Sequence, residues 1–258
     1  MKPEGGFGLF LKYVLQCSEF CFGGFATGFS QCLRCGRRRD TSVTPITGGA
    51  RTTQGDPDLQ PERGSTWEAG GEFRINGNAK VSATCYETRL SNLIYLKQVV
   101  TTPPALSLRI NAAKARIRGI ELGATGRLTS WLELDANYAY IDSVMLENTA
   151  DPLSVGKRLT DSPRNIAGAG LTARQGAWSG SLSARHVSHS FFTAQNTDTV
   201  EGVPGSYDAH TMVNARLGYE FGKGLKGTVS INNLLNTKAY SYFLLPGRNV
   251  TAEMDFSF

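Results

Sequence analysis

Apolar and polar residues alternate at every second position over most of the chain from about Ser65 onward. From Val250 to Phe258, Val, Ala, Met and Phe occupy the even positions, and Thr, Glu, Asp and Ser occupy the odd positions. Leu132 to Tyr140 and Val213 to Phe221 repeat this pattern. Because successive side chains of a β-strand point to opposite faces, the pattern predicts strands with one apolar and one polar face.

Nine segments carry this alternation, and the connections between them are alternately short and long. The segments lie near residues 65–75, 79–90, 114–127, 130–143, 164–173, 177–189, 209–221, 225–236 and 249–258. The short connections lie near 76–78, 128–129, 174–176 and 222–224, and the long ones near 91–113, 144–163, 190–208 and 237–248. Outer-membrane barrels have short turns on one side and long loops on the other. Strands of about 10 to 13 residues are long enough to cross a bilayer at a tilt.

The predicted fold is therefore all-β: an antiparallel, up-and-down transmembrane β-barrel. Bacterial single-chain barrels have an even number of strands, so about nine strands indicate part of a larger barrel. No apolar run approaches the roughly 20 residues that a spanning helix requires, so a membrane position requires a barrel. Aromatic residues near strand ends favour an interfacial girdle over ordinary core packing; they are Trp131, Tyr219, Phe221, Tyr240, Tyr242, Phe256 and Phe258.

The first 55 residues differ from the rest and are predicted to be an irregular or poorly ordered segment, with the barrel part at 56–258. Four of the five cysteines fall there, at Cys17, Cys21, Cys32 and Cys35. They lack the neighbouring His and turn signals of a zinc site, so no metal is expected. Lys12 and Glu19 interrupt the apolar stretch that an export signal needs, which suggests that an earlier part of the gene product precedes this sequence.

The charge of the chain is moderately basic, with a formal net charge of +5 and a pI near 9.0. Its densest basic run is Arg37 to Arg39, next to Arg34. No aromatic stacking pattern accompanies this run, so it is interpreted as a solvated linker and no nucleic-acid partner is expected.

Several motifs in residues 56–258 together resemble the C-terminal barrel of TonB-dependent receptors. They are Asp56 to Glu62, Trp67 to Gly70, Arg118-Gly119-Ile120-Glu121-Leu122, Leu132 to Asp142, Ile231 to Asn236 followed by Tyr240, Pro246-Gly247-Arg248 and the last residue, Phe258. The family's energy-coupling box, its plug domain and most of its roughly 22 strands have no counterpart in this sequence. The expectation is therefore a receptor fragment.

The resemblance implies energy-coupled uptake of a scarce nutrient across the outer membrane of a Gram-negative bacterium. A ferric siderophore is the expected cargo, with haem and cobalamin as alternatives, and no resident cofactor is implied. The implied partners are outer-membrane lipid and lipopolysaccharide, the barrel-insertion machinery, the TonB complex acting through the plug, and the chelate itself. Met254, Phe256 and Phe258 of the last strand are the candidate signal for the insertion machinery.

One basic cluster in the barrel part is a candidate for ligand binding. Arg109, Lys114, Arg116 and Arg118 lie around the start of a predicted strand, after a predicted long connection. Their positive field is suited to steering an anionic chelate. Solvated side chains at the rim, or side chains paired with lipopolysaccharide, are the alternative interpretation.

The alternatives to the receptor are a hydrolase on a small barrel, a haem-binding protein and an autonomous channel. His186 and Ser188, with Asp198 or Asp208 as orienting acid, carry a hydrolase hypothesis, but no nucleophile-elbow motif accompanies them. His186, His189 and His210 are the candidate haem ligands. The chain is predicted not to be an enzyme.

Overall fold

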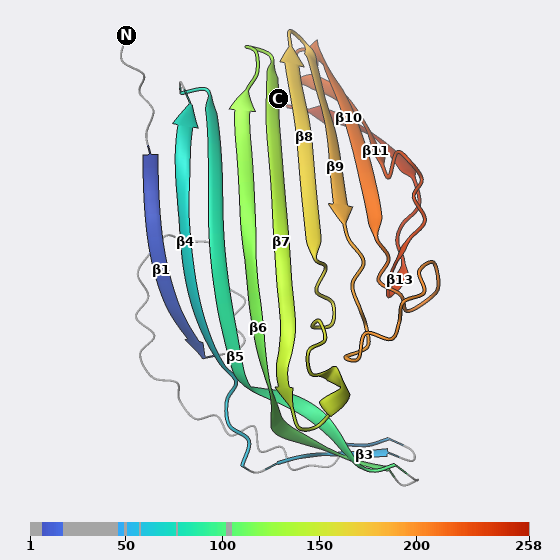
Figure 1. Ribbon diagram of the computed structural model, residues 1–258. Coiled ribbons are helices and arrows are strands. Elements are labelled where there is room, and N and C mark those ends of the chain that lie inside the picture. The colour runs from blue at the N-terminus through green and yellow to red at the C-terminus, as the bar shows by residue number, and fades with distance from the viewer. Residues whose placement is uncertain are drawn as a thin grey trace.

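A computed structural model describes residues 7–17, 46–48, 51–56, 58–75, 77–101 and 105–257. These residues form one main antiparallel sheet in which ten strands lie side by side (Figure 1). In spatial order they are β1 (Phe7–Cys17), β4 (Arg63–Ile75), β5 (Ala79–Val100), β6 (Ala105–Arg127), β7 (Leu132–Asn148), β8 (Asn165–Gln175), β9 (Trp178–Val187), β10 (His210–Gly222), β11 (Leu225–Asn232) and β14 (Asn249–Phe256). The short strands β2 (Ile46–Gly48) and β3 (Arg51–Gly55) pair beside this path.

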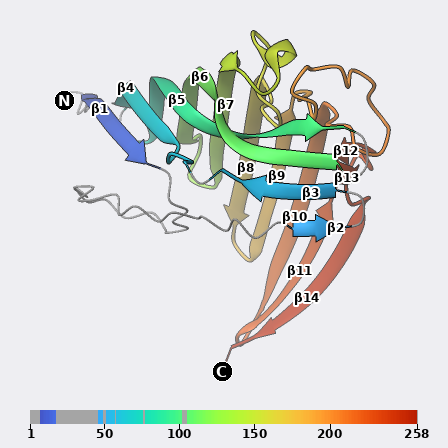
Figure 2. The same ribbon diagram turned by 90° about the horizontal axis from the view of Figure 1, so that it is seen from below.

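All nine predicted strands are confirmed, as β4 to β11 and β14, and each pairs with the next strand of the sheet along the chain. The all-β, up-and-down fold is therefore confirmed. Within the described residues the sheet does not close, because β1 and β14 lie at its two edges. The end-on view shows the resulting open arc (Figure 2), which agrees with a partial barrel.

Helical structure is minimal in the described part of the chain. It consists of one 3-10 turn, η1 (Pro152–Ser154), in the connection between β7 and β8. None of the described residues lies in a helix long and apolar enough to span a membrane.

Residues in the short turns adopt a left-handed backbone. Gly77 has φ 67°, and Lys223 and Gly224 have φ 54° and 74°. A positive φ at two successive residues matches the right-handed twist of a tight β-hairpin, which explains the close approach of β10 and β11. A Cβ at Gly224 would also lie 2.6 Å from Oγ of Ser257. Glycine is therefore required there on two grounds.

One predicted long connection, at 91–113, is wrong. β5 continues to Val100 and β6 begins at Ala105, so the two strands extend as a hairpin. Residues rich in Leu, Ile, Tyr and Val flank the tip and favour strand pairing. Register shifts after Leu90 and at Ile94 break the strict alternation that the sequence analysis relied on. Figure 2 shows this extension running across the arc toward β12 and β13, with β3 paired in parallel to β6.

The segment 1–55, expected to be irregular, contains three strands among its described residues. β1 pairs with β4 over its whole length, from Phe7 opposite Phe73 to Cys17 opposite Arg63. The sequence itself has apolar residues at every odd position from Phe7 to Leu15. Phe10 and Val14 are also apolar but occupy even positions, so the alternation is irregular and the strand was not predicted. The boundary at residue 55 stays a prediction, and Cys21, Cys32, Cys35 and Arg34 to Arg39 lie outside the described residues.

The registers join apolar positions into continuous rows across the sheet. One row runs from Leu134 of β7 through the aligned positions of β8 to β14; its members are Leu171, Leu182, Ala215, Ile231 and Val250. Several of these side chains are largely exposed in the isolated chain, including Leu182 at 46% and Val250 at 64%. So extensive an exposed apolar face is unusual for a soluble protein and suits contact with lipid.

The opposite face of the sheet is polar and carries ion pairs between neighbouring strands. Lys80 Nζ lies 3.1 Å from a carboxylate oxygen of Glu72, and Arg174 lies 3.4 Å from Glu133. The buried hydrophobic cluster of the described residues is small: Ala113, Ala115 and Met145, with Leu90, Leu93, Tyr95 and Leu159 packed against it. A soluble sandwich would bury its large apolar side chains between two sheets. The described strands instead leave many of them exposed on one face of the sheet.

The aromatic residues predicted to lie near strand ends do so only in part. Trp178 packs against Tyr219 at 4.6 Å between ring centroids, and Tyr219 against Phe221 at 4.9 Å, at the short-turn end of β9 and β10. Tyr240 and Tyr242 instead lie in the long connection after β11, where β12 (Tyr240–Ser241) pairs with β13 (Phe243–Leu244). Phe258 lies outside the described residues.

Candidate functional site

Three long connections gather at one end of the sheet, opposite the short turns (Figure 1). They span residues 149–164, 188–209 and 233–248. The extended β5–β6 hairpin lies at the same end. This loop end is the place where side chains from distant parts of the sequence meet away from the two faces of the sheet, so it is the first candidate for a functional site.

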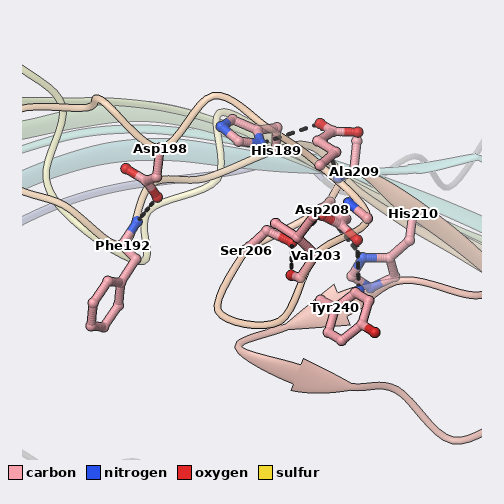
Figure 3. Close-up of polar contacts among 11 residues, drawn as sticks. His189, Phe192, Asp198, Val203, Ser206, Asp208, Ala209, His210 and Tyr240 are labelled. Carbon is pink, nitrogen blue, oxygen red and sulfur yellow. Dashed lines mark hydrogen bonds and ion pairs between the residues drawn. The ribbon is translucent and has the colours of Figure 1, made fainter.

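Asp208 is a buried carboxylate that joins two of these connections (Figure 3). Its Oδ1 accepts hydrogen bonds from the backbone N–H of Gly202 at 2.9 Å and from Oγ of Ser206 at 2.6 Å. Its Oδ2 accepts one from the N–H of Tyr240 at 2.7 Å. A single side chain thus ties the connection before β10 to the β12–β13 hairpin.

The protonation of Asp208 is coupled to these contacts. Burial raises the pKa of its carboxyl, but the hydrogen bonds from Ser206, Gly202 and Tyr240 favour the ionised form, and the net pKa lies below its usual value. A group with a depressed pKa stabilises the fold above the pKa of the unfolded chain, about 4 for Asp. That contribution is lost as the pH falls through the lower, folded value. The loop contact should therefore weaken only below about pH 4.

Replacing Asp208 by Ala should release both connections. The N–H groups of Gly202 and Tyr240 would lose their acceptor, at a cost of up to about 1–3 kcal/mol for a group that stays shielded from water, whereas the Ser206 hydroxyl would keep the carbonyl oxygen of Val203 as acceptor. We expect faster amide hydrogen exchange at Gly202 and Tyr240 together, measured by mass spectrometry. Asp255→Ala removes an exposed carboxylate from β14 and serves as the control. Unchanged exchange at both amides in Asp208→Ala would contradict the assigned role.

Asn233 and Asn236 fix the connection between β11 and β12. Both have a left-handed backbone, with φ 52° and 53°, which Asn tolerates better than most residues. The buried Asn233 side chain donates to the carbonyl oxygens of Thr237 and Pro246 and accepts from the N–H of Thr237. The Asn-Leu-Leu-Asn sequence at 233–236 is therefore a structural turn motif.

Arg158 and Arg164 place two positive charges near the connection between β7 and β8. Burial and the neighbouring Arg164 lower the pKa of the Arg158 guanidinium, only partly offset by Asp142. Arg158 donates to the carbonyl oxygen of Ser162 at 2.6 Å and lies over the ring of Phe191, while its Nε is buried without a hydrogen-bond partner. This pair is not among the residues predicted from the sequence, although Arg164 borders a strand and Arg158 follows a turn.

The four predicted basic ligand residues are not brought together at the loop end. Arg109 is exposed in the extended hairpin, and Lys114 pairs with Glu147 at 2.9 Å. Arg118 lies 2.8 Å from Asp142. Arg116 and Arg118 alternate with Gly119 and Glu121, and so share the face of β6 that carries Ile120 and Leu122. Whether the four residues steer a chelate stays a prediction.

The residues of the hydrolase hypothesis do not contact one another. His186 Nδ1 lies 3.0 Å from Oγ1 of Thr211, and Oγ of Ser188 accepts from the N–H of Asn165. Asp198 is occupied by the N–H groups of Phe192 and Thr193 (Figure 3). A base and nucleophile need to be within hydrogen-bond reach, so this geometry offers no triad.

The three candidate haem ligands are also separate. His189 pairs with Glu201 at 3.2 Å, and Nδ1 of His210 contacts the backbone carbonyl of Asp208 (Figure 3). His186 lies on β9 facing Thr211. In the part of the chain that the structure describes, no group of three or more His, Cys, Asp or Glu residues is arranged to hold a metal ion.

Comparison with known proteins supplies the family context for this geometry. A family model described as TonB dependent receptor-like, beta-barrel, matches residues 21–234. The matched range begins within the segment 1–55, for which no resemblance was expected. The ferrioxamine B receptor of Salmonella typhimurium is 28% identical over 203 residues, which cover 72% of this chain and 27% of the receptor. An uncharacterized TonB-dependent receptor of Haemophilus influenzae is 34% identical over 110 residues, covering 43% of this chain and 30% of that protein.

Solved receptor structures share the fold. The ferric-catecholate import receptor Fiu of E. coli K12 matches with a TM-score of 0.66 and 15% identity over 98% of this chain and 33% of that one. The siderophore receptor PiuA from Acinetobacter baumannii matches with a TM-score of 0.62 and 18% identity, covering 77% and 29%. The chain thus spans about a third or less of the length of these relatives.

Proposed function

Because this chain belongs to the TonB-dependent receptor family, we propose that it contributes strands to an outer-membrane receptor that takes up a ferric siderophore with energy supplied through TonB. Its relatives are receptors and transporters, and this confirms the prediction that it is not an enzyme. The family resides in the outer membrane of Gram-negative bacteria, which is the location proposed for this chain.

The observation that carries the proposal is the sidedness of the sheet. Its apolar rows suit lipid contact, and its polar face suits the interior of a large barrel. The three long connections lie together at one end, where the family presents loops to the outside. A cargo arriving from the medium would meet that end first.

A ferric siderophore is proposed as cargo on two grounds. Relatives named for ferrioxamine B, ferric citrate and ferric catecholates recur among the matches. In addition, the Arg158 and Arg164 charges and the exposed Arg109 lie at the loop end, where a positive field attracts anionic chelates. Haem and cobalamin are the other cargoes to be tested.

The decisive experiment is uptake in the source bacterium. The locus that encodes this sequence is deleted, and uptake of radiolabelled iron is followed with ferrioxamine B, ferric citrate, ferric catecholates and haemin, alongside labelled cobalamin. We expect loss of uptake of one ferric siderophore, restored by the native locus and abolished by a tonB deletion. Loss of haemin or cobalamin uptake alone would replace the proposed cargo. Unchanged uptake of every compound would refute the receptor function.

The last strand is proposed to act as the recognition signal for the barrel-insertion machinery. Met254 and Phe256 are 59% and 66% exposed on the apolar face of β14, an edge strand in the described sheet. Removing Phe258 from the product of the native locus should lower its outer-membrane level several-fold, measured by immunoblotting of membrane fractions. Val250→Ala, which trims the same face at the other end of β14, is the control. Equal levels of the shortened and intact proteins would argue against a signal.

A further inference from the structure

A band of charged residues crosses the apolar face of β5 to β7, on the loop side of the apolar rows. The registers align Trp67, Glu87, Arg118 and Asp142 in one row, and Ser65, Arg89, Arg116 and Val144 in the next. The next row toward the short turns contains Ala69, Cys85, Ile120 and Tyr140. We call Glu87, Arg89, Arg116, Arg118 and Asp142 the charged belt.

The height of the charged belt corresponds to the edge of the membrane. Nine steps along β6 separate Arg127, at the short turn, from Arg118. At about 3.3 Å per residue this is about 30 Å along the strand. The strands of such barrels are tilted by about 40°, and their outward-facing apolar band is about 25 Å tall. The charged belt therefore lies near the limit of this band on the side of the long connections.

The positive charge of the belt is incompletely neutralised. Arg89 and Arg118 each use Nε to contact one acid, Glu87 and Asp142, both at 2.8 Å. Arg116 has no ion pair among the described residues, and its Nε is buried without a hydrogen-bond partner. It also lies directly opposite Arg89 on the neighbouring strand, and like charges in that position repel each other. An anion bound between the two side chains would relieve this repulsion.

An apolar groove lies on the same face, between the charged belt and the short turns. Its walls include Ala69 and Gly71 of β4, Ala83 of β5 and Leu122 of β6, and it ends at Phe73 and Val81. Small residues in the middle of the groove and larger residues at its short-turn end leave a hollow on the apolar face. Four residues along β5 separate Ala83 from Glu87, or about 13 Å. A ligand that has an anionic group for the charged belt and a hydrocarbon chain for the groove fits both.

We propose that Arg89, Arg116 and Arg118 bind a phosphate of lipopolysaccharide, with one of its acyl chains in the groove. The inference rests on the outer-membrane location proposed above. The guanidinium groups supply the planar, forked donors that suit phosphate. Lipopolysaccharide is chosen over phospholipid because the belt lies on the side of the long connections, which faces the outer leaflet.

The test measures lipopolysaccharide bound to the protein purified from outer membranes as the product of its native locus. Arg89, Arg116 and Arg118 are all changed to Gln, and bound lipopolysaccharide is quantified by native mass spectrometry. We expect about a tenfold or greater loss, because each charge-assisted hydrogen bond contributes about one factor of ten. The matched control changes Lys80, Arg127 and Arg174 of the polar face to Gln and should bind normally.

Three further arms distinguish the alternatives. Lipopolysaccharide stripped of its phosphates should not rebind to the delipidated native protein. Inorganic phosphate alone should not compete with intact lipopolysaccharide for binding. Displacement by phosphatidylglycerol vesicles would identify a phospholipid site and overturn the proposal, as would equal lipid in the Gln variant. If that variant fails the heat-dependent gel shift of folded barrels, Arg→Lys changes at the same positions keep the charge and should retain part of the binding. None of these readouts depends on siderophore uptake.

Discussion

Leu182→Arg should strongly destabilise the folded protein and lower its amount in the outer membrane. Leu182 lies near the middle of β9 and is 46% exposed on the apolar face, between Leu171 and Ala215 of the neighbouring strands. Arg on the lipid face of a barrel costs about 2–4 kcal/mol at the centre of the bilayer. Since a typical domain is stable by only about 5–15 kcal/mol, a large part of that stability would be lost. Urea titration of the barrel in lipid vesicles, with the gel shift as readout, measures the change.

The matched control is the adjacent residue on the same strand. Ser183 is also exposed, but it points to the polar face, where it aligns with Asn214. Ser183→Arg introduces the same side chain one position away and should change stability by less than about 1 kcal/mol. Equal losses in both variants would mean that the two faces of the sheet do not face lipid and water, and the membrane interpretation would fail.

Gly119→Ala should be the most damaging single-methyl addition among the glycines of the sheet. A Cβ on the buried Gly119 would collide with the backbone carbonyl of Tyr140 and lie 2.7 Å from the hydroxyl of Tyr86. Because one obstacle is backbone, β6 and β7 would have to separate locally. Overpacking of this kind costs about 1–3 kcal/mol. We expect a lower urea midpoint and less folded protein in membranes.

Gly180→Ala provides the comparison. A Cβ there would meet its nearest neighbour, the carbonyl oxygen of Arg216, at 3.6 Å, which is an ordinary contact. Its stability should match the parent protein or exceed it slightly, because Ala restricts the unfolded chain. If Gly119→Ala proved as stable as Gly180→Ala, the close packing of Tyr86 over Gly119 would be wrong. The same packing gives a physical reason for Gly in the Arg118–Leu122 motif.

The strands were predictable because apolar and polar residues alternate with a period of two along the sequence. Where the pairing is regular, as from Leu132 to Tyr140, each side chain keeps to its face and the pattern is legible. The extended hairpin was missed because bulges beside Leu93 shift the register and interrupt the period. β1 was missed for another reason: Phe10 and Val14 add apolar residues at positions where the pattern calls for polar ones.

The site was less predictable, because its contacts depend on residues far apart in the chain. Lys114, Arg116 and Arg118 form a cluster in the sequence, but each finds a different environment: an ion pair with Glu147, an unpaired buried Nε, and an ion pair with Asp142. Alternation alone places Arg116 on the same face of β6 as Ile120, as observed, but it does not show which side chains Arg116 meets there. The role of Asp208 depends on Tyr240, which lies 32 residues away, and no local signal reveals that contact.

The carboxylate of Asp208 also constrains how the outer end of the molecule can move. Since it holds the stretch around Gly202 and Ser206 and the start of β12 at once, neither can swing outward without releasing the other. The two connections are therefore linked, and a displacement of either one requires the other to follow or the hydrogen bonds of Asp208 to break.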